Sequence, residues 1–202
     1  MKLFNKPGAC SLASHIALKE VGASFDLDEV DTDEGRTKSG LDYTKINPKG
    51  YVPSLELDTG EILTEGASVL QYIADQYPQS GLAPRNGTIA RARLHEYLNY
   101  TSSELHNAFG PFFSSKATEE DKTKAGANVA KKFDYLEDLL ADGRTYLLGD
   151  NFSVADSYLF VVSNWSNFVG IDLKKWPHVA AFVERVAKRP AAQAAMKAEG
   201  LI

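Results

Sequence analysis

Residues 2–21 read KLFNKPGACSLASHIALKEV, which combines three local signals in one short segment. Lys2–Phe4 has the length and apolar content of a short strand, and Lys6–Gly8 is typical of a turn. Apolar residues four apart indicate a helix over Ser11–Val21, and Gly22 follows where a helix commonly ends. The sequence therefore predicts a strand, a turn and a helix in succession.

The next segment, up to Tyr77, adds further strands and a second helix. Phe25–Asp31 predicts a strand by its partial alternation, and the polar stretch Thr32–Gly40 is expected to hold a short irregular helix. Asp58-Thr59-Gly60 is a hairpin signal. The strands beside it and the helix after them are expected at Ser54–Leu57, Glu61–Thr64 and Glu65–Tyr77. This order, β-α-β and then β-β-α, predicts an α/β domain with a small mixed sheet.

The rest of the chain is expected to be helical. Residues 78–87 contain two prolines and two glycines without a helical or strand period, which predicts a linker. The expected domains are therefore residues 1–77, with the mixed sheet, and residues 88–202, with helices only.

Two helices of the second domain show clear apolar stripes. The first follows Thr118, which can cap the helix and has Asp121 three residues later. The second follows Ser153, with Asp156 in a capping-box arrangement. The stripes consist of Val129, Phe133, Leu136 and Leu140 and of Val154, Tyr158, Val161, Trp165 and Phe168. Both patterns predict helices with one buried face.

The composition excludes several classes of protein. The chain has 202 residues, 22 Lys and Arg against 27 Asp and Glu, and a formal net charge of −5. Its basic residues are scattered, which argues against nucleic acid as a partner, and no apolar run has the roughly 20 residues of a membrane span. A single cysteine, Cys10, cannot form an internal disulfide, and no Cys/His cluster has zinc-ligand spacing, so no metal site is expected. We expect a protein of the cytoplasm.

Cys10 lies where the turn meets the first helix. There its sulfur should face the free N–H groups of the first helical turn, which favour a thiolate, so we expect a lowered pKa for this thiol. The alternative is a buried cysteine that serves as a small apolar residue. His15, one turn further on, is expected to face solvent or to join a local polar network.

Four motifs occur along the chain, namely Lys6-Pro7-Gly8-Ala9-Cys10-Ser11-Leu12-Ala13-Ser14-His15, Asn47-Pro48-Lys49-Gly50 with Val52-Pro53, Thr64-Glu65-Gly66, and Asn99 through Glu104-Leu105-His106. They resemble the glutathione transferases, and most closely the bacterial beta class. The resemblance runs the whole length of the chain. It implies a thioredoxin-like domain that binds glutathione, followed by an all-α domain. It also implies glutathione as co-substrate, no permanently bound cofactor, a small electrophile as second substrate, and a homodimer.

The resemblance assigns roles in the first domain. Pro53 is implied to follow a cis bond, so that the backbone of Val52 pairs with the cysteinyl unit of glutathione, although the sequence alone favours an ordinary trans proline. The helix start at Glu65 and Gly66 is implied to hold the γ-glutamyl end, where free N–H groups accept its carboxylate and Glu65 meets its ammonium. Ser11 is a minor candidate that could donate to the thiol or cap the helix.

In the second domain, helical spacing places Asn99, Ser103 and His106 in one sector and Leu94, Leu98 and Leu105 in another. Spacing alone does not separate a site from a solvated surface. The resemblance implies that His106 lies beside the sulfur and that Asn99, Ser103, Glu104 and Leu105 contribute to glutathione binding. It also implies a dimer, across which Glu104 could reach.

The chain departs from the pattern at two positions. Gly35 stands where relatives often have a lysine for the glycyl carboxylate of glutathione, and Arg36 or Lys38 could replace it. Asn5 stands where relatives commonly have tyrosine, which disfavours a tyrosine-activated mechanism.

The expected function is transfer of the glutathione thiol to an apolar electrophile, with Cys10 and His106 as catalytic residues. Cys10 could also form a mixed disulfide with glutathione. Candidate pocket residues for the electrophile are Phe109, Phe112, Phe113 and Trp165, which could equally belong to the core. The alternatives are a glutathione-dependent monothiol redox catalyst and a non-catalytic carrier of glutathione or apolar molecules.

Overall fold

The computed structural model describes all of residues 1–202 and divides into two compact units. The first comprises Met1–Ala83 together with Lys188–Ile202, and the second comprises Pro84–Ala187. The boundary thus lies inside the segment expected to be a linker. The final segment was expected in the second domain, and this was wrong. It belongs to the first unit because α10 (Pro190–Ala198) packs on α1 (Ser11–Glu20).

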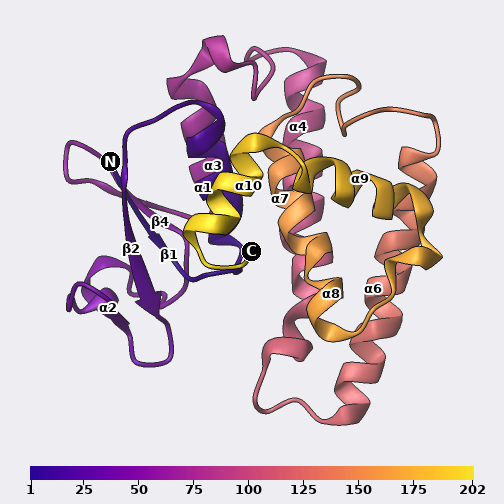
Figure 1. Ribbon diagram of the computed structural model, residues 1–202, viewed down its shortest axis with the longest axis horizontal. Coiled ribbons are helices and arrows are strands. Elements are labelled where there is room, and N and C mark those ends of the chain that lie inside the picture. The colour runs from indigo at the N-terminus through magenta and orange to yellow at the C-terminus, as the bar shows by residue number, and fades with distance from the viewer. The chain divides into compact units, whose positions relative to one another are not determined.

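The first unit contains a five-stranded mixed sheet in the order β3-β2-β1-β4-β5 (Figure 1). Strand β1 (Lys2–Asn5) pairs in parallel with β2 (Asp26–Asp31) and antiparallel with β4 (Ser54–Glu56). Strands β5 (Ile62–Thr64) and β3 (Arg36–Thr37) complete the edges, both antiparallel to their neighbours. The predicted mixed sheet and hairpin are confirmed.

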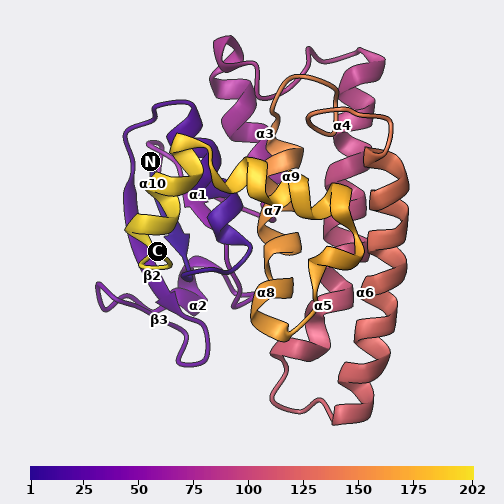
Figure 2. The ribbon, with the colours of Figure 1, turned by 45° about the vertical axis from the view of Figure 1, so that its right-hand side comes forward.

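Helices cover both faces of this sheet. Helices α1 and α3 (Gly66–Gln76) lie on one face, with α10 beside α1 (Figure 2). On the other face, α2 (Tyr43–Ile46) contributes the buried ring of Tyr43 to a cluster with Phe4 and Val52. A short 3-10 turn, Pro78–Ser80, follows α3. Cys10, the residue before α1, is therefore held at one end of a packed helix.

The short helix expected within Thr32–Gly40 was wrongly placed. Asp31 Oδ1 accepts hydrogen bonds from the N–H groups of Asp33 and Glu34, at 2.9 and 3.0 Å, and these turn the chain back into β3. The helix forms later, as α2, where the Asp42 side chain caps it. Side-chain bonds to nearby N–H groups thus decide this segment.

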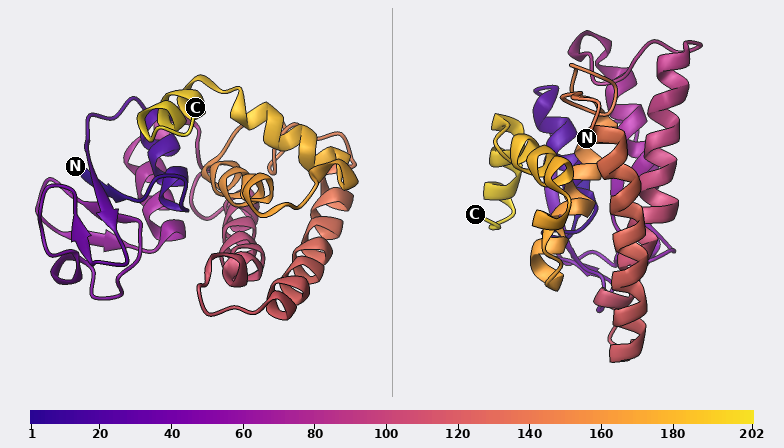
Figure 3. Two further views of the ribbon diagram at one scale, coloured as in Figure 1. Left: turned by 60° about the horizontal axis from the view of Figure 1, so that its bottom comes forward. Right: turned by 90° about the vertical axis from the view of Figure 1, so that its right-hand side faces the viewer.

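The second unit is entirely helical, as predicted (Figure 3). No helix in the structure is both long and apolar enough to cross a membrane. Helix α7 is buried along nearly its whole length and packs against α4 and α9. The helices are α4 (Ile89–Tyr100), the π-helix η2 (Thr101–His106), α5 (Asn107–Phe109), η3 (Gly110–Phe113), α6 (Glu119–Leu140), α7 (Val154–Asn164), α8 (Ser166–Val169), η4 (Leu173–Lys175) and α9 (Pro177–Ala187).

The predicted cap at Thr118 and the predicted capping box of Ser153 with Asp156 are both present, and Thr118 also forms a capping box with Asp121. The first apolar stripe is buried throughout, as is the second as far as Trp165. Phe168 does not continue it, because α7 ends at Asn164 and the chain turns into α8, which leaves that ring 70% exposed.

Candidate active site

Cys10 is the N-cap residue of α1, directly after the turn formed by residues 6–9. The turn is closed by a 3.0 Å hydrogen bond from Ala9 N to Lys6 O, and Gly8 adopts a φ of 72°, which glycine takes without strain. The Cys10 thiol donates to the carbonyl of Val52 at 3.2 Å. The sulfur is thus fixed by a contact from a segment distant in the sequence.

The predicted lowering of the Cys10 pKa is wrong. Burial raises the pKa of this thiol to about 12, and the N–H groups of Cys10 and Ser11 lower it by less. A helix dipole contributes only about 0.3–1 kcal/mol at an ordinary exposed site, whereas burial of an anion costs far more. Cys10 is therefore a neutral thiol that can donate a hydrogen bond.

The peptide bond between Val52 and Pro53 is cis. Tyr51, the residue before Val52, is held in place by two hydrogen bonds. The Tyr43 hydroxyl and the Asn47 amide both donate to the carbonyl of Tyr51, at 3.0 and 2.7 Å. Tyr43 and Asn47 are both buried. The motif around Asn47 therefore fixes the loop that carries Val52.

Ser11 uses its hydroxyl on the turn and makes no helix-cap bond. Its Oγ accepts from Lys6 N at 3.1 Å and donates to Lys6 O at 3.3 Å, and the residue is completely buried. Of the two roles left open by the sequence, capping is therefore contradicted. The hydroxyl instead stabilises the turn that presents Cys10.

Glu65 precedes α3 with a φ of 71°, an unusual value for a residue other than glycine. Its carboxylate oxygen Oε1 accepts from the Lys49 ammonium and, at 2.7 Å, from the Tyr51 hydroxyl. Both contacts lower the pKa of Glu65, with the Lys49 bond the larger cause. The helix start therefore carries a fixed, ionised carboxylate beside the N–H groups of Gly66 and its neighbours.

Gly35 also has a positive φ, of 65°, and a β-carbon there would lie 3.1 Å from the Thr44 methyl group. A side chain at this position would strain the turn. Arg36 and Lys38 follow it, both exposed, and line a surface cavity of about 690 Å³ together with Lys6. Either can supply a cation in place of one at residue 35.

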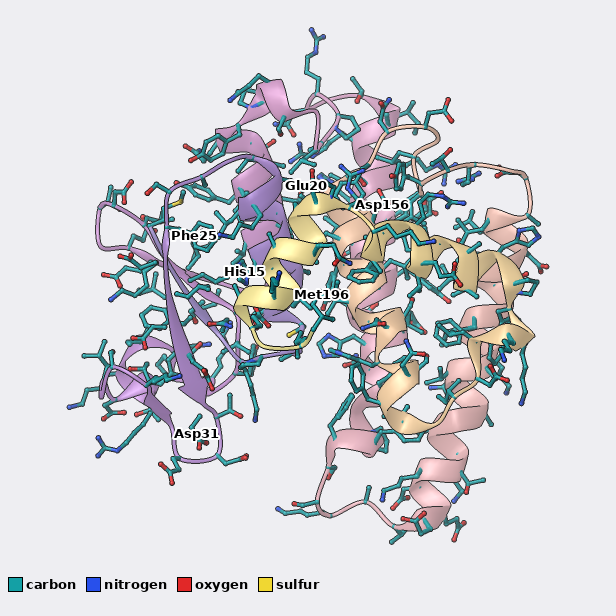
Figure 4. The ribbon with its side chains drawn as sticks, viewed as in Figure 1. His15, Glu20, Phe25, Asp31, Asp156 and Met196 are labelled. Carbon is teal, nitrogen blue, oxygen red and sulfur yellow. The ribbon has the colours of Figure 1, made fainter.

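His15 does not face solvent, contrary to one expectation. It is completely buried between α1 and α10, near Met196 and with its ring 5.5 Å from that of Phe25 (Figure 4). Its Nδ1 lies 2.9 Å from Glu199 Oε1, and Glu199 Oε2 accepts from Gly8 N at 3.0 Å. The role of Glu199 could not be predicted from the sequence, because no local pattern links residue 199 to the first turn of the chain.

In the second unit, His106 ends the π-helix η2. Its Nδ1 lies 2.8 Å from the Tyr158 hydroxyl, and its ring meets that of Trp165 edge-on, at 4.8 Å. Burial lowers the pKa of His106. The ring is therefore neutral near pH 7, and when Tyr158 donates to Nδ1 the ring proton lies on Nε2, free to be donated elsewhere.

Three of the polar residues before His106, namely Asn99, Ser103 and Glu104, are exposed. Ser103 donates to the carbonyl of Asn99 at 2.8 Å, and Glu104 forms an ion pair with Lys132. Leu105 is completely buried in the core, so the expected contribution of its side chain to ligand binding is contradicted. The π-helical turn over Thr101–His106 was not anticipated from the sequence, which indicated an ordinary helix.

The four aromatic candidates differ in exposure. Phe109 is completely buried, with its ring 5.8 Å from that of Trp165, and belongs to the core. Phe113 is 57% exposed and packs edge-on against Trp165 at 5.2 Å. Phe112 is half-buried, 6.1 Å from Phe109. Phe113 is therefore the exposed ring among the four, and it lies against the buried ring of Trp165.

The chain is similar to known proteins along its whole length. Residues 1–75 match the family described as "Glutathione S-transferase, N-terminal domain", and residues 100–190 match its C-terminal domain. The chain is 46% identical over 201 residues to glutathione S-transferase GstA of Escherichia coli O157:H7, with both chains fully covered. It is 48% identical to the beta-class glutathione S-transferase of Sphingomonas chungbukensis, at a TM-score of 0.97. A sphingomonad enzyme solved with glutathione matches at 48% identity and a TM-score of 0.96. Each of these two matches covers the whole of this chain and the whole of the solved one.

Proposed function

The chain belongs to the glutathione S-transferase family, in its bacterial beta class, and from this premise we propose how its own residues perform the transfer. The glutathione thiol loses its proton to solvent, and its thiolate forms a C–S bond with an electrophilic carbon. The leaving group departs with the electron pair of the bond that breaks. The observation that carries this assignment is the Cys10 thiol, which donates to the Val52 carbonyl at 3.2 Å beside the cis Val52–Pro53 bond.

Glutathione binding uses three parts of the first unit. The backbone of Val52 pairs with the cysteinyl unit, and the start of α3 at Glu65 and Gly66 takes the γ-glutamyl end. Arg36 or Lys38 meets the glycyl carboxylate. The exposed, ionised state of Glu65 and the exposed lysine and arginine side chains support these assignments.

When glutathione binds, the Cys10 thiol turns its single proton from the Val52 carbonyl to the thiolate of glutathione, which it stabilises as a hydrogen-bond donor. Its raised pKa keeps the proton on Sγ at neutral pH, and a neutral thiol is a poor nucleophile toward a disulfide. This supports conjugation as the main activity and mixed-disulfide formation at Cys10 as a slow side reaction.

His106 donates a hydrogen bond from Nε2–H to the sulfur of glutathione, and Asn99, Ser103 and Glu104 bind the polar groups of glutathione. The Tyr158 contact, which fixes the ring, supports this role for His106. Phe113 contacts the apolar part of the electrophile, and the buried ring of Trp165 supports it from behind. The working form is a homodimer in the cytoplasm, which the class and the single reduced cysteine favour.

The test is conjugation of an aryl halide by the wild type, Cys10→Ala and Cys10→Ser, together with intact-mass analysis after incubation with oxidised glutathione. We expect Cys10→Ala to lose about tenfold in kcat, because one hydrogen bond to a charged group is lost, and Cys10→Ser to retain most activity. Conjugation unaffected by Cys10→Ala, with rapid adduct formation by the wild type, would show that the cysteine has a redox role instead.

A further inference from the structure

We propose that Lys49 is a further glutathione-binding residue, which binds the α-carboxylate of the γ-glutamyl group while Glu65 binds the α-ammonium. This inference rests on the proposed binding of that group at the start of α3. It adds a cation to a subsite so far supplied only by Glu65 and by backbone N–H groups.

Lys49 is directed to this place by its own turn. The side chain of Asn47 accepts from Lys49 N at 3.2 Å and donates to Tyr51 O at 2.7 Å, which fixes the chain on both sides of the lysine. The ammonium donates to Thr64 Oγ1 at 2.8 Å and to Glu65, and lies 5.3 Å from the centre of the Tyr51 ring.

The hydrogen bonds among Lys49, Thr64, Tyr51 and Glu65 leave one ammonium proton of Lys49 and one carboxylate oxygen of Glu65 available to a ligand. Lys49 has three N–H donors, of which two bond to Thr64 and Glu65. Both protein donors to Glu65 bond to Oε1, and none bonds to Oε2. A free ammonium proton and a free carboxylate oxygen thus lie side by side, and they match the two charges of an α-amino-acid head group.

The backbone supports the same ligand. The first main-chain hydrogen bond of α3 runs from Val69 N to Glu65 O, so the earlier N–H groups of the helix are not used by it. Gly66 offers no hydroxyl, and Lys49 supplies the additional donor that an anion at this helix start requires.

The arrangement is poorly explained as a stabilising device. The side chains of Lys49 and Glu65 are 40% and 55% exposed, and ion pairs this accessible contribute little to stability. Glu65 also holds an unfavourable φ of 71°, and such strain is typical of ligand-binding positions. Lys49 and Tyr51 both donate to the exposed carboxylate of Glu65, and the backbone of Glu65 is strained. A ligand at this position explains these features better than a gain in stability does.

The test combines variants with glutathione analogues in a binding titration. Lys49→Met removes the ammonium and keeps the aliphatic stem, Lys49→Arg restores a cation, and Lys45→Met is a matched control on another exposed lysine of the same unit. The analogues are γ-aminobutyryl-Cys-Gly, which lacks the α-carboxylate, and glutaryl-Cys-Gly, which lacks the α-ammonium.

We expect Lys49→Met to weaken glutathione binding about tenfold, the loss typical of a hydrogen bond between charged groups, and to leave the affinity for γ-aminobutyryl-Cys-Gly unchanged. Lys49→Arg should recover part of the loss. Glu65→Gln should weaken glutathione but leave glutaryl-Cys-Gly unaffected. Equal losses for both ligands in Lys49→Met would overturn the inference, since Lys49 would then act only by holding Glu65.

The experiment also distinguishes failure of the inference about Lys49 from failure of the proposed function. Unchanged glutathione binding by Lys49→Met, with normal binding by the wild type, would refute the role of Lys49 alone. A wild type that binds no glutathione would refute the proposed function and this inference with it. Unfolding curves of Lys49→Met and Lys45→Met that coincide with the wild type would confirm that the binding change is local.

Discussion

The carboxylate of Glu199 bonds at one oxygen to the buried ring of His15, at 2.9 Å, and at the other to the N–H of Gly8, at 3.0 Å. Gly8 lies in the turn that presents Cys10, so the last residues of the chain hold the first turn in place. A Cβ at Gly8 would also lie 3.4 Å from Leu201, which shows how closely the C-terminal segment covers this turn.

We therefore predict that Glu199→Ala destabilises the protein by about 1–3 kcal/mol, since it removes the acceptor beside the buried His15 Nδ1 and the carboxylate that accepts from the Gly8 N–H. The kcat for conjugation should fall as well, because the turn before Cys10 loses its support. Urea unfolding and steady-state kinetics measure the two effects. Lys197→Ala, on the exposed face of α10, is the control and should change neither. Equal stability of Glu199→Ala and the control would contradict the prediction.

Cys10 provides a second prediction, from its raised pKa of about 12. Because alkylation requires the thiolate, the labelling rate should be slow at pH 7 and should rise steadily with pH, with no plateau below about pH 10. The raised pKa also means that the folded state holds this proton more tightly than the unfolded state. Stability from this group should therefore be lost as pH rises above 9. Rapid labelling at pH 7 with a plateau near neutrality would contradict both expectations.

His106 gives a third prediction. Its lowered pKa keeps the ring neutral at pH 7, so the ring should protonate only below the ordinary value of 6.5, and conjugation should show no inflection from this group above it. His106→Phe should lower kcat about tenfold through loss of one hydrogen bond to the sulfur. Tyr158→Phe removes the contact to Nδ1 and should reduce kcat less. NMR titration of the ring checks the pKa directly, and a value above 6.5 would contradict the assignment.

The local features of this fold could be predicted from the sequence, and the long-range ones could not. The capping boxes at Thr118 and Ser153 depend on residues three positions apart, and both are present. The bond between His15 and Glu199 joins residues 184 positions apart, and no periodicity links them. The predicted direction of the Cys10 pKa shift was wrong for the same reason. The position of Cys10 at a helix start is a local feature, whereas its burial depends on the whole fold.

The site shows the same division. The motif around Lys49 is visible in the sequence, but the partnership of Lys49 with Glu65 depends on how the hairpin and α3 return to that motif in the fold. The π-helical turn before His106 departs from the uniform spacing on which helical periodicity relies. Residue types were thus identified from the sequence, and their partners required the structure.

Asp156 gives a fourth prediction. It accepts from Leu147 N at 2.7 Å and from both donors of Ser153, at 2.8 and 2.6 Å, so Asp156→Ala should cost at least about 2 kcal/mol of stability. Burial raises the pKa of this carboxyl from 3.8 to about 6. The folded state therefore binds the proton more tightly, and the contribution of this group to stability should fall as pH rises from 4 to 6. Urea unfolding at both pH values, for wild type and variant, tests the sign, and a wild type that gains stability relative to Asp156→Ala over this range would contradict it.

The last prediction concerns the electrophile. Phe113 is 57% exposed and packs edge-on against Trp165, 5.2 Å away, so its removal uncovers little core. Phe113→Ala should therefore raise the KM for aryl electrophiles several-fold, through loss of apolar contact area, and leave the KM for glutathione unchanged. Phe168→Ala is a suitable control, because that ring is 70% exposed on α8 and has no role in the proposed pocket. A rise in the KM for glutathione, or an equal effect of the two variants on the aryl substrate, would show that Phe113 does not contact the electrophile.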